Sequence, residues 1–348
     1  MLDDENVVGQ RDRQHALGVA ASLYTQLRYD GELTNDDHDG REITSIVIAG
    51  MGGSALAADM AKVLLAQHIR VPLEVVKSYD LPHYVNHHTL VIASSHSGNT
   101  EETVSVLQQA IDHPDRPQIA VIATGGKLVE MASKADIMCA QFPHDTQPRM
   151  GVFYNLRMLF KLLVAFKVIP RQRFSELAEQ HDWLEQKTQG WVKEVPTERN
   201  KAKQLALIAV GKTPVIYGGT LMAPVAYKWK ISWNENAKNV AFWNQYPECN
   251  HNEFLGWTSH PVEKPFVVFD LISKLEHPRV LKRFSLSDTL LSGRRPKAQV
   301  IPMVGSTLLQ QMLWGCVLSD FVSIYVGILN NVDPTQVDLI ERFKKELG

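Results

Sequence analysis

Two short segments combine glycine with hydroxyl side chains, a set of groups suited to binding small anions. Residues 49–55 read AGMGGSA and residues 94–102 read SSHSGNTEE, and each segment follows an apolar run. Glycine lets an anion approach the backbone, and a helix that follows it presents unpaired N–H groups and the positive end of its dipole. The dipole alone contributes only about 0.3–1 kcal/mol at an exposed site, so several donors must converge on the ligand.

The predicted ligand of these segments is the phosphate of a small monoester. The two segments match neither GxxxxGK[ST] nor GxGxxG, which disfavours a nucleotide, and Glu101 and Glu102 would repel a polyphosphate. We expect the phosphate to bind Gly52, Gly53, Ser54, Ser95, Ser97 and Thr100. The alternative is that residues 97–102 form only a turn and a helix cap, in which Thr100 and the glutamates serve the first helical turn.

Apolar runs that alternate with segments of helical spacing would position these donors. In the first half of the chain such runs lie at residues 43–50, 73–80, 89–95 and 118–124, and polar or glycine-rich residues follow each of them. The alternation predicts a parallel sheet covered by helices on both faces. Ligands of such open sheets collect beyond the carboxyl ends of the strands, which is where both segments lie.

The same alternation returns later in the chain. Residues 151–168 have helical apolar spacing up to Pro170, and charged amphipathic segments follow. The run TPVIYGG at 213–219 then joins a strand to glycines again, and we predict further strands at 264–272 and 297–304 and a long buried helix at 307–331. We therefore predict α/β architecture with a first domain at 1–150, a helical bridge at 151–200 and a second domain at 201–348. Each domain is expected to be a three-layer α/β/α arrangement around a mainly parallel sheet.

Composition argues against several classes of protein. A net charge of −2 and a pI of about 6.7 give no overall basic field for nucleic acid or anionic lipid. No run approaches the roughly 18–20 apolar residues that a bilayer span needs, and the acidic N-terminus is unlike a secretory signal. The three cysteines form no CxxC pair and no even set for disulfides. We expect a cytoplasmic protein that binds neither nucleic acid nor membrane.

Six motifs in order along the chain resemble one family. They are GMGGS, SxSGNTEET, QPRMG (147–151), WNENAK (233–238), NHNEFLGW (250–257) and DPTQVDLIERFKKEL (333–347). Together they are similar to the bifunctional phosphoglucose/phosphomannose isomerases, which carry two sugar-isomerase (SIS) domains, over residues 40 to 348. The resemblance implies a homodimer with a shared active site and no metal or other cofactor. It also implies interconversion of glucose 6-phosphate, and mannose 6-phosphate, with fructose 6-phosphate through an enediol, a step of glycolysis and gluconeogenesis.

This chemistry needs a base that moves a proton between C2 and C1, a group that opens the sugar ring, and positive charge near the enediolate. The resemblance implies that Glu235 is the base and that Arg149 stabilises the enediolate. It implies that His251, supplied by the neighbouring subunit, opens the ring, and that Lys344 assists, with Lys345 solvated.

Each assignment has a structural alternative. Glu235 could be a solvated helix glutamate, Arg149 a partner in an inter-domain ion pair, and Lys344 a cation that only favours its helix dipole. A metal site at Cys249 and His251 is disfavoured because no second cluster with zinc spacing accompanies them.

One position departs from the family pattern. The family has tyrosine between the two serines of the SxS loop, whereas this chain has His96. Side chains alternate along an extended segment, so His96 is expected to point away from Ser95 and Ser97. Its role is either packing, which we favour, or proton transfer. Two other functions remain open at this point: a regulator that binds a sugar phosphate, and an isomerase of a different sugar phosphate.

Overall fold

The computed structural model describes residues 1–259 and 265–347. Residue 264 of the predicted strand at 264–272, and residues 260–264 and 348 of the predicted second domain, lie outside the described residues. The chain forms two compact units. One is Leu23–Trp183, called here the 23–183 unit. The other joins Met1–Ser22 to Leu184–Gly348 and is called the 184–348 unit.

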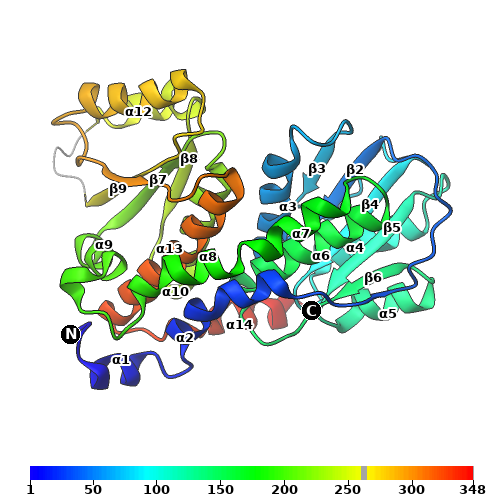
Figure 1. The fold of residues 1–348 in the computed structure, drawn as a ribbon, viewed down its shortest axis with the longest axis horizontal. Coiled ribbons are helices and arrows are strands. Elements are labelled where there is room, and N and C mark those ends of the chain that lie inside the picture. The colour runs from blue at the N-terminus through cyan, green and yellow to red at the C-terminus, as the bar shows by residue number, and fades with distance from the viewer. Residues whose placement is uncertain (260–264, 348) are drawn as a thin grey trace. The chain divides into compact units, whose positions relative to one another are not determined.

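The 23–183 unit is built on a mainly parallel sheet (Figure 1). Its strands stand in the order β1 (Leu33–Thr34), β6 (Met138–Gln141), β5 (Gln118–Ala123), β4 (Thr89–Ser95), β2 (Ser45–Ala49), β3 (Leu73–Val76), and β1 alone runs antiparallel to its neighbour. All seven residues of β4 are buried, as expected for a parallel strand covered on both faces.

Helices cover both faces of this sheet. The helices α4 (Glu101–Ile111) and α5 (Gly126–Lys134) pack on one face, where Ala93, Val121 and Leu107 share a buried cluster. The helices α3 (Gly52–Leu65) and α6 (Val152–Ala165) contact each other and the sheet. The predicted three-layer α/β arrangement is confirmed for this unit.

The 184–348 unit holds a smaller sheet in which every neighbouring pair is parallel. Its strands stand in the order β10 (Gln299–Pro302), β9 (Phe266–Ile272), β7 (Thr213–Gly218), β8 (Phe242–Gln245). The helices α10 (Ala223–Asn236), α13 (Leu308–Leu329) and α9 (Lys201–Ala209) pack together, with α10 also against β7 and β8. The helix α12 (Pro278–Leu290) closes the opposite face through Val280 and Phe284.

Short elements complete the chain. In the 23–183 unit they are η1 (Leu23–Arg28), η2 (Pro148–Met150) and α7 (Arg171–Glu179), and α8 (His181–Thr188) leads into the other unit. The 184–348 unit adds α1 (Glu5–Arg11), α2 (Ala16–Ser22), η3 (Gln189–Trp191), η4 (Thr197–Arg199), η5 (Glu248–His251), α11 (Glu253–Gly256) and α14 (Asp338–Leu347).

The bounds of the two units differ from those of the predicted domains. Residues 151–183 belong to the 23–183 unit, because the apolar side chains of α6 bury against α3 and the sheet. The first 22 residues belong instead to the 184–348 unit. The carboxylate of Asp3 accepts a 2.8 Å hydrogen bond from the buried Lys203 Nζ, a contact between positions 200 residues apart.

The long helix α13 corrects one expectation. It is 22 residues long with a mean hydropathy of 1.8 in its most apolar window, so one segment does reach the length and composition of a membrane span. Within the structure 94% of that window is buried. Its Asp320 is paired at 2.5 Å with Lys228 of α10. The helix therefore forms the core of its unit, as the prediction of a long buried helix stated.

The two sheets share one topological feature. In each, the first strand of the parallel set (β2 or β7) lies between the second strand (β3 or β8) and the third (β4 or β9). The direction of strand addition thus reverses between β2 and β4, and between β7 and β9. Ligands of doubly wound sheets bind beyond the carboxyl ends of the strands at such a reversal.

Candidate phosphate site and catalytic residues

Both glycine–hydroxyl segments lie at the reversal point of the 23–183 unit. The strands β2 and β4 pair in parallel with Ala49 opposite Ala93, so both segments leave the sheet at the same edge. A Cβ on Gly50 would lie 2.9 Å from the Ser94 carbonyl oxygen, which shows how closely the two turns approach. The expectation that neighbouring strands end in these segments is confirmed.

The SxS loop is tightly folded on its own hydroxyl groups. Ser95 Oγ accepts a 3.1 Å hydrogen bond from the Gly98 N–H and lies 2.7 Å from Thr100 Oγ1. Ser97 Oγ accepts from the Asn99 N–H at 3.2 Å. Gly98 has φ 72°, and a Cβ there would lie 1.7 Å from the Gly125 carbonyl oxygen, so only glycine fits.

The capping alternative accounts for only part of this loop. Thr100 occupies the N-cap position of α4, but its side chain makes no capping hydrogen bond and pairs with Ser95 instead. When two hydroxyls pair, one donates to the other, and the proton of the accepting hydroxyl stays available for a ligand. The Ser95–Thr100 pair can therefore still donate to an anion.

The adjacent helix α3 begins without a side-chain cap. Its N-cap residue, Met51, makes no side-chain hydrogen bond to the first-turn N–H groups, and Gly52 has φ 51°. Ser54 is 5% exposed and its N–H bonds to the Met51 carbonyl oxygen at 3.1 Å. The N–H groups of an uncapped helix start are ready donors for an anion.

Arg149 is brought to this helix start by its own short 3-10 helix, η2. A Cβ on Gly53 would lie 2.4 Å from the Pro148 carbonyl oxygen and 3.5 Å from the Arg149 Cα, so the backbone of η2 packs directly on the first turn of α3. Arg149 itself is 2% exposed. The structure thus joins one predicted catalytic residue to the predicted phosphate residues within a single unit.

The unusual His96 is buried in an aromatic cluster. Its ring lies 5.4 Å from that of Phe142 and 5.1 Å from that of His144, measured between centroids, and a Cβ on Gly151 would lie 2.8 Å from its Cδ2 atom. Among the described residues neither ring nitrogen has a hydrogen-bond partner. Burial, reinforced by His144 and opposed by Asp145, lowers the pKa of His96 to about 4. The ring is therefore neutral near pH 7, which favours packing over proton transfer.

Glu235 lies half-buried on the last turn of α10, in the 184–348 unit. The neighbouring amides fix this turn: Asn236 Nδ2 donates to Ser323 Oγ at 2.9 Å, and Asn234 Oδ1 accepts from the Ala241 N–H at 3.1 Å. Lys238 Nζ donates at 2.7 Å to the carbonyl oxygens of both Glu235 and Asp333. The WNENAK and DPTQ motifs are thus neighbours in space.

His251 is exposed at the end of η5. Its loop is anchored through other residues: Asn250 Nδ2 donates to Ser287 Oγ at 3.0 Å, and Asn244 Nδ2 donates to Glu253 at 2.6 Å. The histidine ring is therefore presented outward from a fixed segment.

Lys344 lies on α14 and pairs with Glu341 at 2.9 Å, with both side chains more than 60% exposed. Such an exposed pair contributes little to stability. The predicted apolar side of this helix is largely exposed as well, since Ile340 is 43%, Phe343 65% and Leu347 58% exposed. Val337 is half-buried.

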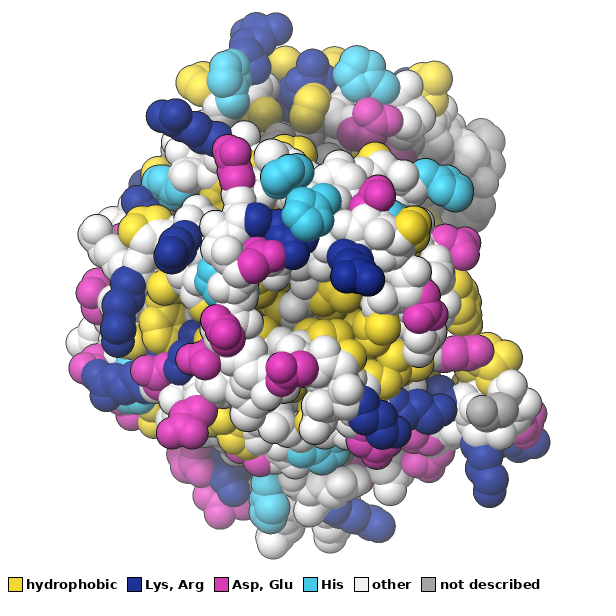
Figure 2. Space-filling model, turned by 90° about the vertical axis from the view of Figure 1, so that its right-hand side faces the viewer, with side chains coloured by type: hydrophobic (Ala, Val, Ile, Leu, Met, Phe, Trp, Pro, Cys, Tyr) yellow, Lys and Arg dark blue, Asp and Glu magenta, His cyan; other side chains and the backbone are white. Residues whose placement is uncertain are grey.

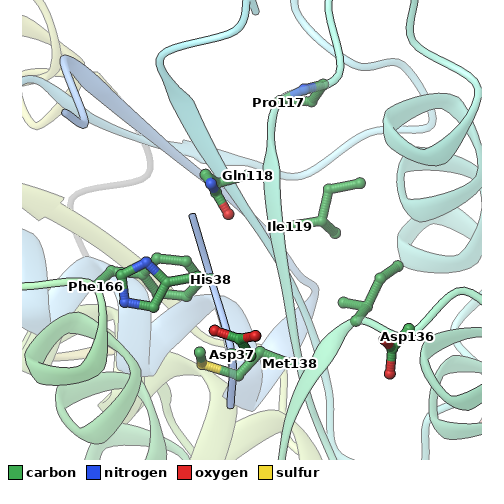
Figure 3. Close-up of a pocket in the computed structure, with 9 residues that line it drawn as sticks. Asp37, His38, Pro117, Gln118, Ile119, Asp136, Met138 and Phe166 are labelled. Atoms are coloured by element: carbon green, nitrogen blue, oxygen red, sulfur yellow. The ribbon is translucent and has the colours of Figure 1, made fainter. Parts of the chain in front are cut away.

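A pocket of about 170 Å³ lies elsewhere in the 23–183 unit (Figure 3). It is lined by Gln118 and Met138, at the amino ends of β5 and β6, and by His38, whose ring lies 5.0 Å from that of Phe166. The pocket is at the end of the sheet opposite the phosphate-site residues, and none of those residues lines it.

Figure 2 shows acidic and basic side chains interspersed over one face of the molecule.

Comparisons with known proteins agree with the motifs. Residues 198–347 match the model of the bacterial phospho-glucose isomerase C-terminal SIS domain. The chain is 35% identical over 310 residues to a bifunctional phosphoglucose/phosphomannose isomerase of Caldicellulosiruptor bescii, covering 88% of this chain and 90% of that protein. It is 32% identical to the protein of the same name from Aquifex aeolicus, covering 87% and 90%. Its fold is similar to a glucose-6-phosphate isomerase like protein from Thermus thermophilus, with a TM-score of 0.62, 18% identity and coverage of 99% and 98%.

Proposed function

We propose that this chain, which belongs to the bifunctional phosphoglucose/phosphomannose isomerase family, interconverts glucose 6-phosphate and mannose 6-phosphate with fructose 6-phosphate. It is an aldose–ketose isomerase that acts through an enediol. The observation that carries the proposal is the packing of Gly53 on η2, which holds Arg149 beside two converging anion-binding turns.

The substrate phosphate is assigned to the 23–183 unit. The N–H groups of Gly52 and Gly53 and the hydroxyl of Ser54 belong to the uncapped start of α3. The hydroxyls of Ser95, Ser97 and Thr100 approach from the neighbouring loop. A set of this size suits a monoester phosphate, whose oxygens accept several hydrogen bonds at once.

The proton transfer is assigned to Glu235. From the open-chain aldose the carboxylate removes the C2 proton, which leaves an enediolate, and it returns a proton to C1 to give the ketose. The fixed charge of Arg149 stabilises the negative oxygen of the intermediate. A positioned general base is typically worth about 10²–10⁴-fold in rate.

Ring opening is assigned to His251, assisted by Lys344. The enzyme is proposed to act as a homodimer. Histidine titrates near neutrality and can protonate the ring oxygen while it accepts the hydroxyl proton. The outward position of His251 in its own chain supports action on a sugar bound by the partner subunit. The exposed apolar side of α14 supports a subunit interface, because exposed apolar side chains that line one helix face are typical of one.

We also propose a cytoplasmic enzyme that serves glycolysis and gluconeogenesis. The three cysteines are free and buried, which suits a reducing compartment.

The test is a coupled assay of the purified protein with fructose 6-phosphate that records both aldose products, run beside Glu235→Gln. The wild type is expected to form both aldoses, and Glu235→Gln to lose about 10²–10⁴-fold in kcat. The matched control Glu198→Gln removes an exposed carboxylate of the same unit and keeps full activity. Binding of hexose phosphates by the wild type without turnover would instead support the regulatory alternative.

A further inference from the structure

The turn that follows β7 resembles the turn that follows β2 in two backbone relationships. A Cβ on Gly50 would lie 3.3 Å from the Ala55 nitrogen, and a Cβ on Gly218 would lie 3.2 Å from the Ala223 nitrogen, five positions on in each case. The N–H of Ser54 bonds to the Met51 carbonyl oxygen at 3.1 Å.

The second turn has the corresponding bond. The N–H of Met222 bonds to the Gly219 carbonyl oxygen, also at 3.1 Å. Aligned in this way, Leu221 and Met222 stand where the phosphate turn has Gly53 and Ser54.

In the second turn an anion is already in place, and it comes from the chain itself. The loop after β9, the strand that neighbours β7, carries Glu276. Glu276 Oε1 accepts hydrogen bonds from the N–H groups of Leu221 at 2.8 Å and Met222 at 3.3 Å, and the residue is 4% exposed. At the corresponding place in the other unit, β4 ends at Ser95 and the loop after it carries Ser97 and Thr100.

The fit around this carboxylate is close. A Cβ on Gly219 would lie 2.3 Å from the carboxyl carbon and from Oε1 of Glu276, so the turn leaves room for the carboxylate only because residue 219 is glycine. Burial raises the pKa of Glu276 above its ordinary value, and the hydrogen bonds from Leu221 and Met222 offset only part of that rise.

We propose that residues 218–222 form a second anion-binding turn whose resident ligand is the carboxylate of Glu276, and that this internal ligand limits each chain to one sugar phosphate. The inference rests on the proposed function in so far as Gly53 and Ser54 are taken to bind phosphate. The ligand class that the emptied turn would accept is inorganic phosphate or a phosphate monoester. Its affinity is expected to be below that of the first site, because Met222 lacks the hydroxyl that Ser54 supplies.

The test counts phosphate bound per chain by equilibrium dialysis with radiolabelled inorganic phosphate. The wild type is expected to bind one phosphate and Glu276→Ala two. Glu276→Gln retains an oxygen acceptor and the side-chain volume, and it is expected to bind one. Glu198→Ala, which removes an exposed carboxylate from the same unit, is a second control and is also expected to bind one.

A double variant makes the assignment specific. Adding Gly219→Ala to Glu276→Ala places a Cβ where the carboxylate lay, so the count should return to one. If Glu276→Ala does not fold, Glu276→Ser, which also removes the carboxylate, takes its place in the measurement of phosphate bound per chain. A folded variant of either kind that binds no more phosphate than the wild type would overturn the inference. A wild type that binds none would count against the proposed phosphate site, whereas the gain of one in the variant tests the second turn alone.

Discussion

A Cβ added to Gly53 would lie 2.4 Å from the carbonyl oxygen of Pro148, which is closer than real Cβ contacts come. This contact joins the predicted phosphate turn to the segment that carries Arg149. The distance between the phosphate turn that is proposed to anchor the substrate and the Arg149 charge that is proposed to stabilise its intermediate is therefore set by one backbone contact.

Gly53→Ala should slow the isomerisation. The new methyl group must push η2 away from α3, which displaces Arg149, and a shift of about 1 Å near a reacting centre can cost about 10²-fold in rate. We expect kcat with fructose 6-phosphate to fall by about that factor, measured in the coupled assay.

The matched control for this variant is Gly125→Ala. Gly125 lies in the same unit, and a Cβ there would meet nothing within 4 Å. Wild-type kcat in Gly53→Ala would show that the close contact with Pro148 does not position Arg149.

His96→Tyr should remove an acid-sensitive component of stability. The folded-state pKa of His96 is lowered to about 4 from 6.5, so the unfolded chain binds a proton there more readily than the folded one. The stability that the neutral ring confers is full above pH 6.5 and is lost as the pH falls towards 4. For a residue only 5% exposed, this difference corresponds to about 3 kcal/mol.

The measurement is urea unfolding of both proteins at pH 7.5 and pH 4.5. The wild type should lose more free energy of unfolding between these pH values than His96→Tyr, by about 2–3 kcal/mol. Because the comparison is a difference between two proteins, the other titrating groups cancel to first order. Equal losses in both proteins would mean that His96 is protonated as easily in the folded chain as in the unfolded one.

Much of the site's frame could be predicted from the sequence. The apolar runs that end in glycine and serine predicted neighbouring strands and converging turns, because continuous apolar strands alternating with helices have few ways to pack. The contact between Gly53 and Pro148 could not be predicted, since nothing in either segment indicates that a helix start and a distant loop touch. Glu276 was missed for a related reason: its loop, SKLEHP, has no anion-site pattern, and only the fold places its carboxylate on the N–H groups of Leu221 and Met222.

The expectation that no segment reaches the length and composition of a membrane span was wrong for α13, whose apolar sequence contains one charged residue. Asp320 interrupts the apolar sequence of α13, and the unit accommodates this buried carboxylate by pairing it with Lys228. Likewise, the association of Met1–Ser22 with the 184–348 unit depends on contacts such as Asp3 with Lys203, which no local pattern reveals.

Two inactive variants should complement each other if active sites are shared. His251→Ala and Glu235→Gln are each expected to lose most activity alone. In mixed dimers one of the two sites combines an intact Glu235 with an intact His251 from the partner subunit, so random mixing should restore about one quarter of wild-type activity. The measurement is the coupled assay after the two proteins are unfolded and refolded together. No recovery, with mixed dimers shown to form, would place both residues in the same chain's site.

The apolar side of α14 should matter for assembly. Phe343→Ser removes an aromatic ring that is 65% exposed in the single chain, and we expect a shift from dimer to monomer with a parallel loss of activity. Leu290→Ser is the control, because Leu290 is 61% exposed on α12 of the same unit. Sedimentation velocity over a range of protein concentrations measures the outcome. An unchanged dimer in Phe343→Ser would exclude this helix face from the interface.

Isomerisation of fructose 6-phosphate in D₂O, with the aldose products examined by NMR, tests whether Glu235 transfers the proton. A carboxylate that carries the proton between C1 and C2 exchanges it with solvent, so wild-type glucose 6-phosphate and mannose 6-phosphate should carry deuterium at C2. Glu235→Gln should lower both product formation and deuterium incorporation by about 10²–10⁴-fold. Product formation and deuterium incorporation at the wild-type rate in Glu235→Gln would contradict the assignment of Glu235 as the base.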